Sequence, residues 1–167
     1  MYDDILYPTD GSPGAMAALE HVRDLAEQYD ATVHVLSVLD TTQPALGLGD
    51  DPDKRRAPGM VGHQEGGGEG MIGHRETAED MHEHERERAE AVVDEVTSQL
   101  GSVDTRAVVQ EGAPHEVILD HAEDADMIVM GTHGYSGIER YLLGSIAEKV
   151  VRMADVPVVT VRADEES

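Results

Sequence analysis

The chain is 167 residues long, which suits a single domain with a buried core. Its 35 Asp and Glu residues against 12 Lys and Arg residues give a formal net charge of −23, so no basic face can be assembled and binding to nucleic acid is disfavoured. The absence of cysteine excludes disulfides, thiolate chemistry and cysteine-ligated metals.

Neither a membrane span nor a secretory signal is visible in the sequence. No apolar run approaches the length needed to cross a bilayer, and the opening MYDDILYPTDG has neither a basic segment nor the apolar core of a signal peptide. We therefore expect a cytoplasmic protein that does not bind membranes.

The acidic residues are spread over the whole chain, and Lys54 and Lys149 are its only lysines. Self-repulsion at this charge opposes a compact fold in dilute buffer, whereas molar salt screens it over about 3 Å. The sequence therefore predicts an extreme halophile's protein. An acidic domain that seeks a basic partner is the alternative, which the lack of a distinct acidic cluster disfavours.

The first third of the chain predicts a strand, a helix and a second strand. The first strand covers about residues 4–7, and Ser12 caps a helix that carries Pro13 in its first turn. Apolar residues at helical spacing continue this helix to Tyr29. A run rich in β-branched residues predicts the second strand over residues 32–39.

Residues from about 40 to 75 have no periodic pattern and hold 9 of the 17 glycines. We expect a flexible, glycine-rich insertion there, either a functional loop or a solvated segment without a role. His82 and His84 follow it, but residues two apart do not share a helix face and no third ligand accompanies them. No metal site is predicted.

The remaining elements continue the alternation of helices and strands. A helix is expected over residues 76–100 with its early, charged turns in solvent, and Gly101 ends it. The further expected elements are a strand over 105–109, a helix over 114–123, a strand over 127–130, a helix from Gly144 and a strand over 156–161. The alternation predicts a parallel sheet with helices on both faces.

The run from Met130 to Ser145, MGTHGYSGIERYLLGS, carries the clearest sign of chemistry. A glycine-rich turn leaves a buried strand, and a second glycine and a hydroxyl stand where the next helix begins, which suits phosphate. The Walker motif is excluded because it needs a lysine directly before its serine or threonine, and the residues before Ser145 are Leu143 and Gly144. The dinucleotide motif is excluded because these glycines come late in the chain.

This spacing of Gly131, Gly134 and Gly144-Ser145 resembles the ATP-binding signature of the universal stress protein family. The opening ILYPTDGS and the stretch SIAEKVVRMADVPVVTVR that begins at Ser145 are similar to that family as well, so the resemblance covers nearly the whole chain except about residues 41–88. It implies one domain over residues 1–167 with an open five-stranded parallel sheet of order 3-2-1-4-5, the adenine-nucleotide α-hydrolase-like fold. It also implies that the insertion is a lid over the nucleotide.

In the implied strand order, ligands sit where the order reverses, between the first and fourth strands. Residues 7–10 would there meet Met130 and Gly131 across a crevice. Asp10 is either an acceptor for a ribose hydroxyl or adenine amine, or a turn residue that supports the Gly11-Ser12 bend. The resemblance favours the ligand role for Asp10 and places the backbone of Val38 beside adenine.

The phosphate-side candidates are the glycines of the motif, the Ser145 hydroxyl and nearby backbone amides. His133 either contacts phosphate or ribose or is an exposed loop histidine. Arg140 either screens phosphate charge or pairs with an acid. Because so little positive charge accompanies a triphosphate, a bridging Mg²⁺ or Mn²⁺ ion is a further hypothesis. The full expected nucleotide site comprises Pro8, Thr9, Asp10, Val38, Met130, Gly131, His133, Gly134, Gly144, Ser145, Ile146 and Ala147.

The resemblance implies a protein that binds ATP or AMP and acts in stress response or signalling without robust turnover. An apolar last strand over residues 156–161 would be an exposed edge in a monomer, which together with the resemblance predicts a homodimer through this strand. The alternatives are a slow ATPase or autophosphorylating enzyme, and an interaction module that binds another ligand. The sequence does not identify a protein partner.

Overall fold

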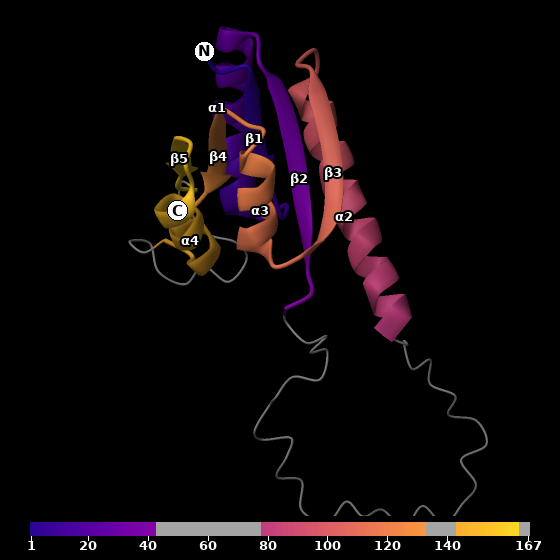
Figure 1. The fold of residues 1–167 in the computed structure, drawn as a ribbon. Helices are drawn as coiled ribbons and strands as arrows, with labels where there is room; N and C mark the ends of the chain where they lie inside the picture. Colours follow the sequence, from indigo (N-terminus) through magenta and orange to yellow (C-terminus); the bar gives the residue numbers. More distant parts are fainter. Residues whose placement is uncertain (43–77, 133–142, 164–167) are drawn as a thin grey trace, which may run out of the picture.

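The computed structural model describes residues 1–42, 78–132 and 143–163, in which strands and helices alternate along the chain (Figure 1). Most of the glycine-rich insertion predicted over residues 40–75 lies outside these described residues. The elements are β1 (Asp4–Pro8), α1 (Pro13–Tyr29), β2 (Thr32–Asp40), α2 (Ala78–Leu100), β3 (Thr105–Gly112), α3 (Pro114–Ala122), β4 (Met127–Gly131), α4 (Ser145–Met153) and β5 (Val158–Val161).

The strands form one parallel sheet of order β3-β2-β1-β4-β5, which confirms the predicted fold. Helices α3 and α4 lie on one face of the sheet, and α1 and α2 on the other (Figure 1). None of the helices in the described residues is both long and apolar enough to cross a bilayer.

Each face of the sheet carries its own apolar core because successive strand residues point to opposite faces. Ile5 and Tyr7 of β1 lie in the core under α1 and α2, whereas Leu6 lies in the core under α3 and α4. Strand β2 divides in the same way, with Val35 in the first core and Leu36 in the second. Burial on both sides explains why these strands read as nearly continuous apolar runs.

Helix α1 begins as its sequence predicts. The Ser12 hydroxyl accepts a hydrogen bond from the Ala15 N–H at 3.3 Å, and Pro13 occupies the first turn. The helix ends at Asp30, whose φ of 53° lies in the left-handed region that stops a helix. The cap at Ser12 fixes where the chain turns from β1 into the helix.

Two strand boundaries differ from the sequence prediction by more than one residue. Strand β3 continues three residues past Val109, because the long β2 keeps pairing with it as far as Asp40 opposite Gly112. Strand β5 begins at Val158 instead of at residue 156. Pro157 has no N–H to give to a ladder, although its carbonyl accepts the Ile128 N–H at 2.9 Å.

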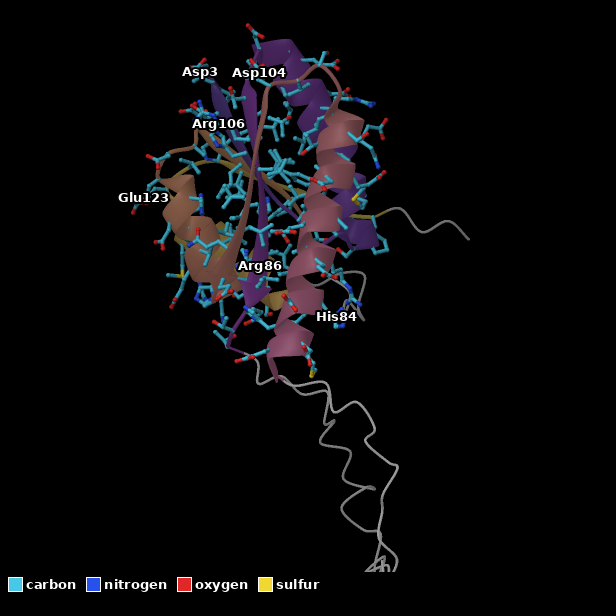
Figure 2. The ribbon with its side chains drawn as sticks, turned by 90° about the vertical axis from the view of Figure 1, so that its right-hand side faces the viewer. Asp3, His84, Arg86, Asp104, Arg106 and Glu123 are labelled. Carbon is cyan, nitrogen blue, oxygen red and sulfur yellow. The ribbon has the colours of Figure 1, made fainter. Side chains whose placement is uncertain are left out.

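The N-terminal half of α2 is tied to the end of β3 through Glu111. The His82 Nε2 lies 2.6 Å from Glu111 Oε1, and the Arg86 guanidinium donates to the same oxygen at 3.1 Å. Figure 2 shows Arg86 in this half of the helix, with Asp3 and Asp104 at the opposite end of the sheet. The early turns of α2 are largely exposed, as predicted, but they are not detached from the sheet.

Removing this carboxylate should loosen the first turns of α2. The hydrogen bonds from His82 and then Arg86 lower the pKa of Glu111, so the contact is present above the ordinary carboxylate pKa and is lost as pH falls through the lowered one. We expect Glu111→Gln to speed amide hydrogen exchange over residues 82–86 at neutral pH and to leave it nearly independent of pH in acid, after correction for intrinsic rates.

Glu87→Gln is the matched control, because Glu87 lies 3.9 Å from His84 on the same helix and does not reach the sheet in the described structure. Its exchange pattern should follow that of the unmodified protein. Equal protection of residues 82–86 in the Glu111→Gln variant and the unmodified protein would contradict a tethering role for Glu111.

Candidate functional site

The sheet opens between β1 and β4 at the carboxyl ends of the strands. The ladder between these strands joins only Ile5 to Met127 and Leu6 to Ile128. By contrast, β1 stays paired with β2 up to Pro8 opposite Leu36, and β4 stays paired with β5 up to Gly131 opposite Val161. The strand order reverses at this point, which is where open α/β sheets place their ligands.

One wall of the opening is the turn from β1 into α1. The Thr9 N–H donates to the Leu36 carbonyl at 2.9 Å, and the Thr9 hydroxyl accepts the Gly11 N–H at 3.2 Å. Asp10 Oδ1 accepts the Ser12 N–H at 2.9 Å, so one carboxylate oxygen supports the bend, as the turn interpretation of Asp10 predicts. Among the described residues, Asp10 Oδ2 forms no hydrogen bond.

Strand β2 continues past the end of β1 and leaves the backbone of Val38 at the opening. The Leu36 carbonyl points toward β1 and the Val33 N–H points toward β3, so alternation turns both the N–H and the C=O of Val38 toward the side that β1 has left. Neither group bonds to β1 or to the turn after it. Val38 is half-buried, with its side chain against the second core.

Gly131, at the end of β4, meets the first turn of α1 rather than open space. A Cβ atom added at Gly131 would lie 2.6 Å from both the carbonyl carbon and the oxygen of Gly14, and 2.8 Å from the Ala15 nitrogen. Glycine is therefore required here for a close approach of two backbones. Its neighbour Met130 points its side chain into the second core, 6% exposed.

The start of α4 lies beside the end of β4. The Gly144 N–H, predicted among the phosphate donors, donates instead to the Thr132 carbonyl at 2.7 Å. Gly144 is the N-cap and, as a glycine, has no side chain to cap the helix. The exposed Ser145 is the first helical residue. The N–H groups of Ser145, Ile146 and Ala147 belong to the first turn, where an α-helix has no internal acceptors for them.

The predicted residues thus divide into three groups. The β1–α1 turn, the Val38 backbone, the end of β4 and the start of α4 lie around one edge of the sheet. Ala147 contributes its side chain to the second core, whereas Ile146 is 37% exposed. His133 and Gly134, together with Arg140, lie outside the described residues.

Three residues near this edge, Tyr7, Thr9 and Ser37, have buried hydroxyl groups and are 0%, 6% and 4% exposed. Residues 7–10 were expected at the crevice and Thr9 was predicted as part of the site, whereas Ser37 was not identified from the sequence. Burial raises the pKa of Tyr7 to about 12, opposed by a hydrogen bond with the Thr9 side chain and reinforced by the charge of Asp10. The single serine within the apolar run TVHVLSVL was the available signal for Ser37.

The described residues offer little positive charge and no metal cage of their own. Lys149 lies on α4 one turn beyond Ser145. Nowhere in residues 1–42, 78–132 and 143–163 do three His, Asp or Glu side chains come together to hold a metal ion.

Comparisons with known proteins agree on one family. The family model described as the universal stress protein family matches residues 1–162. A universal stress protein of Methanocaldococcus jannaschii is 33% identical over 164 residues, which cover 97% of this chain and 83% of that protein.

Solved structures of the same family share the fold. A universal stress protein from Lactobacillus plantarum superposes with a TM-score of 0.71 at 22% identity, covering 96% of this chain and 98% of that one. A universal stress protein family protein of Arabidopsis thaliana with AMP bound has a TM-score of 0.62 at 15% identity, covering 98% and 94% of the two chains.

Proposed function

The chain belongs to the universal stress protein family, and we propose that it binds an adenine nucleotide, ATP or AMP, at the edge where β1 and β4 part. In this proposal the protein is a homodimeric switch in stress response or signalling and does not turn the nucleotide over at a substantial rate. The AMP bound to the similar Arabidopsis protein supports an adenine ligand for this fold.

The observation that carries the proposal is the outward-facing backbone of Val38. Its N–H and C=O point to the side that β1 has left, and neither bonds to β1 or the turn after it. Adenine offers a donor amine next to an acceptor ring nitrogen, so one residue's N–H and C=O can engage both, as in a hydrogen-bonded strand pair. Guanine has a carbonyl oxygen where adenine has the amine. In the same pose this oxygen would lie opposite the Val38 carbonyl oxygen, and two acceptors cannot form a hydrogen bond.

The start of α4 supports a place for phosphate. The N–H groups of its first turn, which have no acceptor within the helix, and the positive end of the helix dipole favour an anion, and Ser145 offers a hydroxyl there. Because the described residues lack a metal cage, Mg²⁺ or Mn²⁺ would be held through the phosphates and water. Phosphoryl transfer needs positive charge to stabilise the transferred group, and the first turn of α4, Ser145–Glu148, contains no lysine. An ATPase or autophosphorylating activity therefore has less support.

The exposed edge of β5 supports the dimer. The carbonyls of Pro157 and Val161 accept N–H groups from the β4 side, so alternation directs the N–H and C=O of Val158 and Thr160 away from the sheet. On the neighbouring α4, Val151 is 44% exposed and Met153 is 55% exposed. An open edge beside exposed apolar residues favours pairing with a second copy.

The first test identifies the nucleotide. We expect protein purified in molar KCl and then denatured to release ATP or AMP, detected by mass spectrometry at about one per chain. In calorimetric titrations of emptied protein, ATP and AMP should bind at least about tenfold more tightly than GTP and GMP, because a mismatched hydrogen-bond pair costs at least that factor.

The backbone contact is tested with Val38→Pro, which removes the N–H without breaking a bond to β1. Its affinity for AMP should fall about tenfold, whereas Val38→Ala, which keeps the N–H, should bind nearly as the unmodified protein does. Release of mostly ADP would favour the ATPase alternative. A protein that releases no nucleotide and binds neither ATP with Mg²⁺ nor AMP would overturn the proposed function and favour the interaction module.

A further inference from the structure

Tyr7 connects β1 to the first turn of α1. Its side chain is completely buried in the core under α1 and α2, and its hydroxyl donates a hydrogen bond to the Ala15 carbonyl. The Thr9 side chain, just past the end of β1, interacts with the same hydroxyl. A buried phenol therefore joins the strand to the helix just beneath the carboxyl edge of the sheet.

The turn that Tyr7 holds is also the one that meets β4. The N–H of Ala15 donates to the Ser12 hydroxyl at 3.3 Å, so both backbone groups of Ala15 are engaged by side chains. The backbone of Gly14 and Ala15 abuts Gly131 so closely that a Cβ there would lie within 2.8 Å of both residues. A displacement of this turn would therefore change the backbone contact with Gly131 directly.

The contacts continue from β4 to α4. Thr132, which follows Gly131, donates its N–H to the Val161 carbonyl at 2.9 Å and accepts the Gly144 N–H at 2.7 Å. Hydrogen bonds and one tight backbone contact thus run from the Tyr7 hydroxyl through α1 and β4 to Gly144, the N-cap of α4. The two ends of the proposed nucleotide site, the β1–α1 turn and the start of α4, lie along this path.

We propose that Tyr7 is a positioning residue for the nucleotide site: its hydroxyl, through the Ala15 carbonyl and Gly131, sets the separation between the β1–α1 turn and the start of α4. This inference rests on the proposed function. Phenylalanine fills the same core space at position 7 and cannot donate to Ala15, so α1 would lose its tie to β1 while the apolar packing remains.

The test compares three variants in the full chain. Tyr7→Phe removes the hydroxyl under study, and Tyr2→Phe removes one from the partly buried Tyr2, which packs against Tyr29 at the other end of α1. Val96→Ala reduces the core at a fully buried position of α2 and serves as a stability control away from the carboxyl edge.

Amide hydrogen exchange without nucleotide is the first readout. In Tyr7→Phe we expect Met16, Thr132 and Gly144 to exchange at least about fivefold faster, relative to the slowest core amides, than in the unmodified protein. Val96→Ala, which lowers stability without touching this path, should leave those ratios unchanged. A Tyr7→Phe protein with unchanged ratios would overturn the coupling, whether or not the protein binds nucleotide.

Titration with AMP is the second readout. We expect Tyr7→Phe to lower the affinity about tenfold at a temperature where all variants are folded, with Tyr2→Phe and Val96→Ala within about twofold of the unmodified protein. Replacement of Tyr7 by 4-aminophenylalanine, which restores a donor, should recover the affinity. Unchanged affinity in Tyr7→Phe, or equal loss in Val96→Ala, would contradict a positioning role. If the unmodified protein binds no nucleotide, the proposed function fails, and so does the role of Tyr7 in that site.

Discussion

Gly131→Ala is expected to lower the free energy of unfolding by about 3 kcal/mol and to abolish nucleotide binding. The added methyl group would lie 2.6 Å from the carbonyl carbon and oxygen of Gly14, well inside van der Waals contact. Backbone atoms at the capped start of a helix cannot rotate away as the end of a flexible side chain can. Relief would need α1 to move away from β4, which would disturb the core under α1 and α2 and the edge where the nucleotide is proposed to bind.

Gly101→Ala is the matched control for this prediction. Gly101 ends α2 with a φ of 61°, and a Cβ added there would meet nothing within 4 Å. The substitution should cost only the left-handed backbone strain, about 1–2 kcal/mol, and leave nucleotide affinity unchanged. Denaturant unfolding in molar KCl and titration with AMP measure both effects. A Gly131→Ala protein as stable as Gly101→Ala would show that the close approach to Gly14 is not rigid.

The role of Gly131 also shows where sequence reasoning stopped. The glycine spacing identified an important turn, and the resemblance attached phosphate to it, but no pattern in one sequence reveals which backbone approaches a glycine. The structure gives Gly131 a packing contact with Gly14 and uses the Gly144 amide for Thr132. Both assignments depend on tertiary contacts: Gly131 and Gly14 are 117 residues apart in the sequence (131 − 14), and Gly144 and Thr132 are 12 apart (144 − 132).

The strands, by contrast, could be predicted because their apolar residue types indicate that they are buried. Runs such as ILYP and MIVMG are apolar on both faces, which only a strand covered by helices on both sides allows. Strand ends were less predictable: β3 continues through Gln110-Glu111-Gly112 because β2 provides a partner, not because those residues favour a strand. The Val38 backbone faces the opening because β1 ends before it reaches the level of Val38. The register between β1 and β2 sets this, with Pro8 opposite Leu36 as the last pair.

Thr160→Pro is expected to convert the proposed dimer into a folded monomer. Alternation along β5 directs the Thr160 N–H away from β4, so proline removes a donor at the free edge without removing a ladder hydrogen bond. If two copies pair through this edge, each loses a hydrogen bond and meets a proline ring. Dimer affinity should therefore fall by at least about 100-fold.

Two neighbouring substitutions separate pairing from folding. Val159→Pro removes an N–H directed toward β4 and should destabilise the fold by about 3 kcal/mol or more, whereas Thr160→Val keeps the edge donor and should remain dimeric. Sedimentation equilibrium in molar KCl distinguishes the species, and circular dichroism reports the fold. A Thr160→Pro protein that remains dimeric would place the subunit contact elsewhere. If the monomeric Thr160→Pro protein still binds AMP with unchanged affinity, each chain forms its nucleotide site without a partner.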